Sequence, residues 1–303
     1  MIEVEHLSRY FGDTRAVEDV SFTVRSGEVV GLLGHNGAGK TTIMRMMTGF
    51  LEPTSGSVRI DELDVARDTR AIQQRIGYLP ENCPVWPEMA VIDYLDYRAA
   101  LQGVPPGRRA AAVATAIRRT DLADRAAEPI QTLSRGYRQR VGVAQAILHD
   151  PEIVILDEPT NGLDPTQIRQ MRSLIRELAK ISTIIVSTHV LQEVQAVCER
   201  VLILRAGRLV VDSRLDALQR ADGLMLTVDR DLGQRLAGVP AVRGVTPMRA
   251  NGKFTYLVDA PVDIAPVLAR AVTDAGGALY SLEPRRRDLE AVFASVNEET
   301  ADA

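Results

Sequence analysis

Two kinds of apolar pattern alternate with helical patterns in the first 219 residues. The segments IEVEHL and VSFTV alternate between apolar and polar positions, which is typical of half-exposed antiparallel strands. The segments EVVGLLG, EIVILDE and TIIVSTH are apolar almost throughout, as expected of strands that are covered on both faces of a parallel sheet. The alternation therefore predicts an α/β core that has a parallel sheet and an antiparallel β subdomain.

Helical patterns fill residues 90–148 and are broken at Gly103–Gly107, so we expect a helical subdomain inserted into this core. The run VLILRAGRLVV predicts a hairpin that turns at Ala206–Gly207. From residue 220 to residue 303 the pattern reads strand, helix, strand, strand, helix, strand. This order indicates a small C-terminal α+β domain of the ferredoxin-like type, which follows a first domain of residues 1–219.

Composition and charge narrow the class of protein. The 303 residues are 46% hydrophobic and 25% charged, enough for one large or two modest domains with well-packed cores. No apolar run is long enough to span a bilayer and MIEVEHL lacks a secretory pattern, so we expect a cytoplasmic protein that meets membranes only through another chain. A net charge of -4 argues against nucleic acid as the main partner. Cys83 and Cys198 lack metal-ligand spacing, so we expect reduced thiols.

The strongest chemical signal lies between the apolar strand EVVGLL and the helical segment TIMRMMTGF. Glycines there let the backbone turn several N–H groups toward one anion, and the helix start adds positive partial charge. Lys40 would reach the β- and γ-phosphates of a nucleotide, the Thr41 hydroxyl suits Mg²⁺, and His35 is expected to face solvent. A chance glycine-rich turn would not explain the strand–loop–helix context. The expected nucleotide-binding residues are Gly34, His35, Asn36, Gly37, Ala38, Gly39, Lys40, Thr41 and Thr42.

Two carboxylates, Asp157 and Glu158, end the strand EIVILDE. Because ligands bind at the carboxyl ends of parallel strands, we expect this pair beside the phosphate-binding loop. Asp157 would orient Mg²⁺ and its water, and Glu158 would accept a proton from the attacking water. The sequence Asp-Glu-Pro is also a common loop start, but the preceding apolar run and the upstream loop favour the site.

Three further segments carry candidate contacts to a nucleotide. LSRGYRQR reads as a helix start that is capped by Ser134, with Gly136 leaving room for an anion. One chain cannot easily aim two helix starts at one γ-phosphate, so we expect this one to meet the nucleotide of a second copy. An ordinary capped helix with a basic first turn is an equal alternative. His189 ends TIIVST and could contact a γ-phosphate or be structural, and Tyr10 and Phe11 could stack on adenine or fill the core.

Taken together and in this order, GHNGAGKTT, LSRGYRQR, IVILDEP, NGLD and STH resemble the ATP-binding cassette (ABC) family over residues 2–219. The resemblance implies a P-loop ATPase that uses ATP and Mg²⁺ and works as a head-to-tail homodimer around two ATP molecules. Phe11 falls where the family stacks adenine, with Tyr10 in reserve. The implied roles are Gly34 to Thr42 as Walker A, Ser134 and Gly136 as the signature that meets ATP across the dimer, Asp157 as Walker B, Glu158 as the catalytic base, Asp164 as the D-loop acid and His189 as the switch histidine.

Two departures from the family pattern are similar to one branch of it. Glu81 follows IGYLP where glutamine is common, and the signature reads SRGYRQR rather than SGGQQQR. Together with GYLPEN and RRRDLEAVF, these resemble type-2 exporters of the gliding-motility, multidrug and copper-enzyme maturation kind. The resemblance implies a separate membrane permease and a peripheral location on the cytoplasmic face of the inner (plasma) membrane. We expect Glu81 to act as a Mg²⁺-proximal ligand.

Aromatic residues make up only 4% of the chain, yet Tyr78, Trp86, Tyr94 and Tyr97 fall close together. In the ABC family this stretch belongs to the groove that receives a cytoplasmic helix of the permease, and such rings are favoured interface anchors. Filling the core of the helical subdomain explains them equally well. Two other functions remain open: a soluble mechanoenzyme of the translation-factor or DNA-repair type, and a nucleotide-dependent regulator with no transport role.

Overall fold

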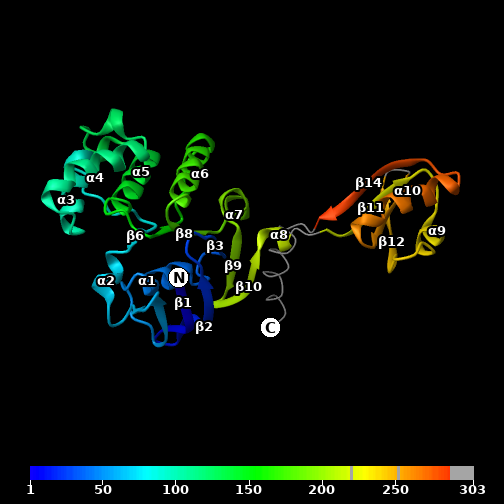
Figure 1. Cartoon of the computed structure of the whole chain (residues 1–303), viewed down its shortest axis with the longest axis horizontal. Coiled ribbons are helices and arrows are strands. Elements are labelled where there is room, and N and C mark those ends of the chain that lie inside the picture. The colour runs from blue at the N-terminus through cyan, green and yellow to red at the C-terminus, as the bar shows by residue number, and fades with distance from the viewer. Residues whose placement is uncertain (219–220, 251–252, 287–303) are drawn as a thin grey trace. The chain divides into compact units, whose positions relative to one another are not determined.

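The computed structural model describes residues 1–218, 221–250 and 253–286 and divides the chain into two compact units (Figure 1). The first unit runs from Met1 to Leu215 and the second from Asp216 to Ala303. The sequence pattern puts this boundary after residue 219. Among the described residues, no helix combines the length and the apolar character that crossing a bilayer requires.

A six-stranded, mostly parallel sheet forms the centre of the first unit. Every residue of β3, β7 and β8 is buried, which confirms the interpretation of the three apolar runs. The edge strand β10 is antiparallel to β9, and the turn between them uses Ala206 and Gly207 at φ of 46° and 80°, as a tight hairpin requires. In sheet order the strands are β10 (Arg208–Arg214), β9 (Arg200–Arg205), β3 (Val29–Leu33), β8 (Thr183–Thr188), β7 (Ile153–Asp157) and β6 (Ile76–Leu79).

A second, antiparallel sheet packs on the helix that follows β3. Its strands in order are β2 (Thr14–Val24), β1 (Ile2–Phe11), β4 (Ser55–Ile60) and β5 (Leu63–Asp64). Because side chains alternate between the faces of a strand, β2 buries Val20, Phe22 and Val24 and exposes the residues between them. These side chains share a core cluster with Met44 of helix α1 (Lys40–Met47). The predicted antiparallel subdomain is therefore present.

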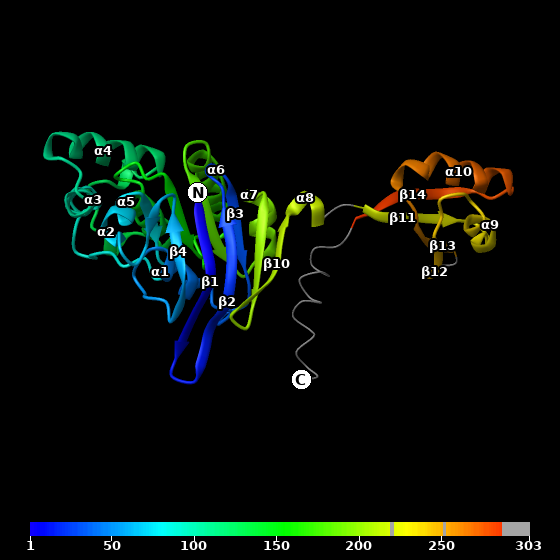
Figure 2. The same ribbon diagram turned by 60° about the horizontal axis from the view of Figure 1, so that its bottom comes forward.

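Helices fill the segment between β6 and β7, as the sequence predicts. Gly103, at φ of 80°, turns the chain after the first of them, and the second starts at Pro106, where a missing N–H costs nothing. Figures 1 and 2 both place these helices together at one end of the first unit. They are α3 (Val91–Leu101), α4 (Pro106–Arg119) and α5 (Arg135–Ala146), with 3₁₀ turns at Ala123–Arg125 and Ile130–Thr132. Further helices are α2 (Thr69–Gln73), α6 (Pro165–Ala179), α7 (Leu191–Val197) and α8 (Leu215–Leu218).

The second unit has the predicted order of elements and the sheet order of a ferredoxin-like domain. All its strand pairs are antiparallel, and the first and third strands lie in the middle of the sheet. Leu224, Leu226 and Tyr256 from the sheet and Leu268 from a helix belong to its core. The elements are β11 (Ala221–Val228), α9 (Gly233–Ala237), β12 (Gly244–Ala250), β13 (Lys253–Asp259), a 3₁₀ turn at Val262–Ile264, α10 (Ala265–Asp274) and β14 (Leu279–Arg286).

Candidate active site

The loop of residues 34–39 joins β3 to the first turn of α1. A methyl group on Gly34 would lie 2.6 Å from the carbonyl oxygen of Leu204, and one on Gly39 would lie 2.6 Å from that of Ala16. Gly39 also has φ of 102°, in the left-handed region that disfavours side chains. Only glycine therefore fits these two positions. The loop ends at the first turn of a helix. A glycine-rich loop followed by a helix start is the arrangement whose backbone N–H groups bind phosphate.

Lys40 begins α1 and its ammonium group is buried beside this loop. Its side chain is 5% exposed, and Nζ donates hydrogen bonds to the carbonyl oxygens of Gly34 at 2.6 Å and His35 at 3.2 Å. Nζ also lies 3.3 Å from Oε1 of Glu158. The ammonium group of Lys40 is thus held where the loop, the helix start and the end of β7 meet.

Asp157 ends β7 and is anchored by a hydroxyl from the neighbouring strand. The register pairs Asp157 with Ser187 of β8, whose Oγ donates to Oδ1 of Asp157 at 2.5 Å and accepts from the N–H of Glu158 at 3.0 Å. Burial is the main cause that raises the pKa of Asp157, while hydrogen bonds from Ser187 and Thr41 lower it. The carboxylate is therefore fixed in place but deprived of water.

Glu158 turns away from Asp157 and toward Lys40 and His189. Its backbone has φ of 49°, a left-handed conformation that costs roughly 1–3 kcal/mol in a residue with a side chain. The carboxylate is buried, with Oε1 facing Lys40 and Oε2 lying 2.9 Å from Nδ1 of His189. His189 follows β8, and its side chain is 40% exposed. The structure thus brings together the predicted residues Lys40, Thr41, Asp157, Glu158 and His189.

Oδ2 of Asp157 is a buried carboxylate oxygen without a hydrogen-bond partner. Oε1 of Glu158 is also buried, but it pairs with the ammonium group of Lys40 at 3.3 Å. An unsatisfied buried acceptor is costly, so Oδ2 of Asp157 points to a site that is completed by a ligand. Oδ2 of Asp157 and the hydroxyl of Thr41 are the hard oxygen donors that Mg²⁺ takes. Within the described part of the chain no group of three or more His, Cys, Asp or Glu could hold a metal, so substrate oxygens and water would have to complete such a site.

Ser134, Gly136 and Asp164 lie at two other helix starts. Ser134 caps α5, because its Oγ accepts from the N–H of Tyr137 at 3.5 Å. Asp164 caps α6, because its Oδ1 accepts from the N–H groups of Thr166 at 2.8 Å and Gln167 at 2.9 Å. The helix-cap interpretation of Ser134 is therefore correct, and it leaves a role at the nucleotide of a second copy as a prediction.

Glu81, Tyr10 and Phe11 are exposed. Glu81 follows β6. Burial is the main cause that raises the pKa of Tyr78 to about 12, and the negative charges of Asp157 and, to a smaller extent, Glu81 raise it further. Tyr10 and Phe11 are 37% and 48% exposed at the end of β1, and the guanidinium of Arg9 lies 4.7 Å from the centre of the Phe11 ring. Packing in the core therefore explains neither ring, whereas stacking on adenine and the metal role of Glu81 stay predictions.

The clustered aromatic residues divide between the core and the surface. Tyr94 is 2% exposed and its hydroxyl bonds to Gln145 of α5, so it is a core residue. Trp86 and Tyr97 are 53% and 37% exposed, and their ring centres lie 5.0 Å apart. Only these two, with half-buried Tyr78, are available for an interface.

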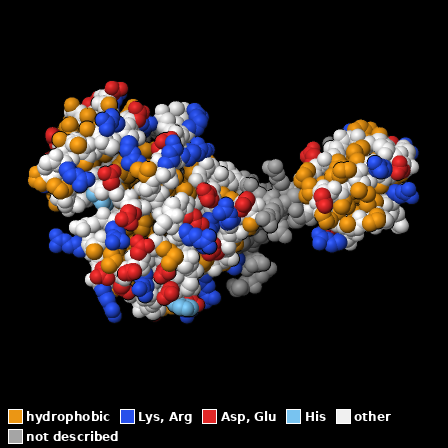
Figure 3. Space-filling view, in the orientation of Figure 1, with side chains coloured by type: hydrophobic (Ala, Val, Ile, Leu, Met, Phe, Trp, Pro, Cys, Tyr) orange, Lys and Arg blue, Asp and Glu red, His pale blue; other side chains and the backbone are white. Residues whose placement is uncertain are grey.

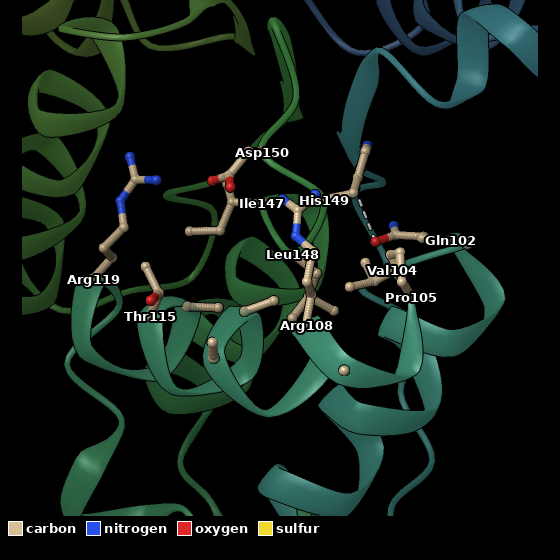
Figure 4. Close-up of a pocket in the computed structure, with 15 residues that line it drawn as sticks. Gln102, Val104, Pro105, Arg108, Thr115, Arg119, Ile147, Leu148, His149 and Asp150 are labelled. Carbon is tan, nitrogen blue, oxygen red and sulfur yellow. Dashed lines mark hydrogen bonds between the residues drawn. The ribbon is translucent and has the colours of Figure 1, made fainter.

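A separate cavity of about 340 Å³ lies between α4 and the end of α5 (Figure 4). Arg108, Arg119, His149 and Asp150 line it, and no residue of the predicted motifs does. Nδ1 of His149 lies 3.0 Å from the side-chain oxygen of Gln102, and burial lowers the pKa of the ring. This cavity is therefore not the nucleotide site.

Ser187 is the functional residue that sequence reasoning missed. It ties Asp157 and Glu158 to the next strand through the two hydrogen bonds given above. A signal was present, because a serine inside a buried apolar strand needs a polar partner. Which partner it has depends on the register between β7 and β8, which the sequence does not specify.

Comparison with known proteins finds relatives of one family. Residues 17–161 match the family described as ABC transporter. The ABC transporter ATP-binding protein NatA of Bacillus subtilis is 36% identical over 228 residues, which cover 73% of this chain and 93% of NatA. The bacitracin transport ATP-binding protein BcrA of Bacillus licheniformis is 34% identical over 222 residues, 73% of this chain and 72% of BcrA. The dimeric structure of a bacterial ABC transporter cassette is 23% identical and has a TM-score of 0.65, covering 71% of this chain and 99% of that one.

Proposed function

This chain is an ATP-binding subunit of the ABC transporter family, and from this membership we propose that it drives a type-2 exporter by hydrolysing ATP. The observation that supports hydrolysis most directly is the cluster of Lys40, Asp157, Glu158 and His189 at the end of a parallel sheet. In this proposal Lys40 is the cation that binds phosphate, Asp157 is the carboxylate that binds the metal and Glu158 is the general base. We infer that a separate membrane permease converts this cycle into movement of a substrate.

The residues of the cluster divide the chemistry among them. Loop N–H groups and Lys40 bind and orient the β- and γ-phosphates. Thr41 and Asp157 would hold Mg²⁺, which would supply positive charge to offset the charge of the phosphate oxygens. Glu158 takes the proton of the attacking water, and His189 keeps that carboxylate turned toward the reacting phosphate.

A second copy of the chain completes the site in this proposal. Ser134 is exposed at the start of a helix of twelve residues, where N–H groups and the helix dipole favour an anion. The related cassette that was solved as a dimer supports the same assembly. Two copies arranged head to tail bring the Ser134–Gly136 turn of each to the ATP held by the other. Asp164 caps α6, whose first turn contacts the start of α5 where Gln167 meets Gly136.

The permease has a candidate docking surface beside the helical subdomain. A pocket of about 710 Å³ is lined by Arg45, Phe50, Tyr78, Arg98 and Leu101, among others. Phe50 is 67% exposed and Leu101 is 60% exposed, and apolar side chains gather over the α3 and α4 end of the unit in Figure 3. Apolar anchors beside arginines suit an amphipathic cytoplasmic helix that carries an acidic residue. Docking there places the chain on the cytoplasmic face of the membrane.

The experiment that tests this function compares ATP turnover of the chain alone and in proteoliposomes with a candidate permease, chosen as a multi-span membrane protein encoded by an adjacent gene. The permease is expected to change the turnover rate, and Leu101→Asp is expected to abolish that change because a carboxylate cannot occupy an apolar contact without loss of solvation. Ile181→Asp is the matched control, since Ile181 is 66% exposed but lies after α6, away from the pocket. A chain that binds ATP without hydrolysing it in either preparation would contradict the proposal.

Glu81→Gln is expected to keep basal ATP turnover within about fivefold of the wild type, because the amide oxygen replaces one carboxylate oxygen as a hard ligand. The measurement is steady-state phosphate release as a function of Mg²⁺ concentration. The variant needs more Mg²⁺ for half-maximal turnover if Glu81 lies near the metal. Complete loss of turnover would instead make Glu81 an essential catalytic group.

A further inference from the structure

The first turn of α5 contacts the start of α6 in the same chain through one side chain. Gly136 is buried, and a methyl group on it would lie 2.5 Å from Cδ, 2.6 Å from Nε2 and 2.7 Å from Oε1 of Gln167. The amide of Gln167 therefore occupies the space that any side chain at position 136 would need. Glycine at this position therefore leaves room for the side chain from α6, in addition to any room that it leaves for an anion.

The same amide closes the cap of α6. Oε1 of Gln167 accepts from the N–H of Asp164 at 3.3 Å, while Oδ1 of Asp164 accepts from the N–H of Gln167 at 2.9 Å. This reciprocal pair is a capping box, which fixes Asp164 relative to the first turn of the helix. Asp164 directly follows the loop of residues 159–163, and that loop directly follows Glu158.

A second contact joins α5 to that loop. A methyl group on Gly162 would lie 2.5 Å from Cζ of Arg135, so the guanidinium rests on the backbone of the loop. Gly162 has φ of 70°, a left-handed conformation that glycine adopts without strain, and it has no side chain to displace the guanidinium. Of the first two residues of α5, Arg135 thus contacts the loop directly at Gly162, and Gly136 contacts it through Gln167, whose amide is bonded to Asp164.

We propose that Gln167 is a positioning residue. When a ligand fills the Ser134–Gly136 turn and shifts it, Gln167 passes that shift to the loop beside Glu158. The inference rests on the proposed function, in which the group that fills this turn is the γ-phosphate of ATP bound by a second copy. Because the Gln167 amide fills the space behind Gly136, a shift of the turn moves the amide. The amide is bonded to Asp164, so the shift reaches the loop and the base, and water attack is coupled to capture of ATP by both chains.

Two near-isosteric substitutions separate this link from simple packing. Gln167→Met keeps a long side chain against Gly136 but has no oxygen to accept the N–H of Asp164. We expect it to lower kcat about tenfold with little change in the KM for ATP, since small misplacements of catalytic groups cost up to about 10²-fold. Gln167→Glu retains the acceptor that a capping box uses and is expected to keep kcat within about threefold of the wild type.

Gln170→Met is the matched control. Gln170 lies on α6 one turn later and accepts from Nη2 of Arg140 at 2.6 Å, so it joins the same two helices without touching the cap at Asp164. The kcat of Gln170→Met is expected to stay within about twofold of the wild-type value, because most surface substitutions change a protein little. Thermal unfolding of all three variants measures any shared loss of stability.

Each outcome bears on one claim. Three outcomes would each overturn the positioning role. They are equal losses of kcat in Gln167→Met and Gln170→Met, full activity in Gln167→Met, and a loss of kcat in Gln167→Glu as large as that in Gln167→Met. The variant Glu158→Gln is expected to form a dimer around trapped ATP, because it binds ATP without hydrolysing it. Adding Gln167→Met should leave this dimer intact, and loss of the dimer would make Gln167 a binding residue instead. Absence of ATP turnover in the wild type would contradict the proposed function itself, whereas wild-type turnover with no effect of Gln167→Met removes only this inference.

Discussion

Glu158→Gln is expected to hold two copies of the chain together around trapped ATP, while turnover falls by roughly 10²–10⁴-fold. The amide keeps the length of the side chain and can still bond to His189, but it cannot accept a proton from water at neutral pH. Lys40 and the loop on one chain, and the start of α5 on the other, are unchanged by the substitution. ATP should therefore still bridge the two chains, and dimer formation should follow nucleotide occupancy by mass action.

Size-exclusion chromatography with light scattering, with and without Mg-ATP, measures this outcome. The control is Glu158→Gln/Ser134→Arg, in which a long side chain replaces the exposed serine at the start of α5 and should block the shared phosphate site. A single variant that binds ATP and stays monomeric, or a double variant that dimerises equally well, argues against a shared site. The measurement is repeated on the complex with the permease, so that a dimer that needs its membrane partner is also detected.

Lys40→Ala is expected to reduce kcat to less than about a tenth of the wild-type value, because it removes the cation that binds the transferred phosphate. Nζ of Lys40 is the group that joins the loop carbonyls to Glu158, so its loss also leaves a buried carboxylate without a cation. Phosphate release under saturating Mg-ATP measures the effect.

Two further variants make the loss of turnover interpretable. Lys180→Ala removes an exposed lysine whose ammonium pairs with Glu177 on the surface, and it should leave kcat unchanged. Lys40→Ala/Glu158→Gln also removes the unpaired buried charge, so it should recover thermal stability that Lys40→Ala has lost while remaining inactive. Turnover above about a tenth of wild type in Lys40→Ala would refute the assignment of the phosphate site.

The parts of the site that the sequence predicts are those set by local order along the chain. The strand, the glycine-rich loop and the helix that carries Lys40 follow one another directly, and Asp157 and Glu158 sit at a strand end. Because parallel strands bring such ends to one edge, their proximity follows without knowledge of side-chain packing. The structure accordingly places Lys40 3.3 Å from Glu158.

The parts that the sequence does not predict depend on contacts between distant segments. Ser187 becomes a partner of Asp157 only through the register of two strands, and Gln167 matters only because Gly136 has no side chain. Burial likewise separates Tyr94 from Tyr97, although both lie on α3, since one face of that helix packs on α5 and the other meets solvent. Helical spacing alone does not say which face is which.

The left-handed backbone at Glu158 lowers the stability of the protein at a residue that the proposed ATP turnover requires. Glycine adopts φ of 49° without strain, so a glycine at this position would relieve a backbone cost of roughly 1–3 kcal/mol. The same substitution would leave the buried ammonium group of Lys40 without its carboxylate, which opposes that gain. A lineage selected only for folding would therefore have to change positions 40 and 158 together before it lost the strain without leaving a buried charge.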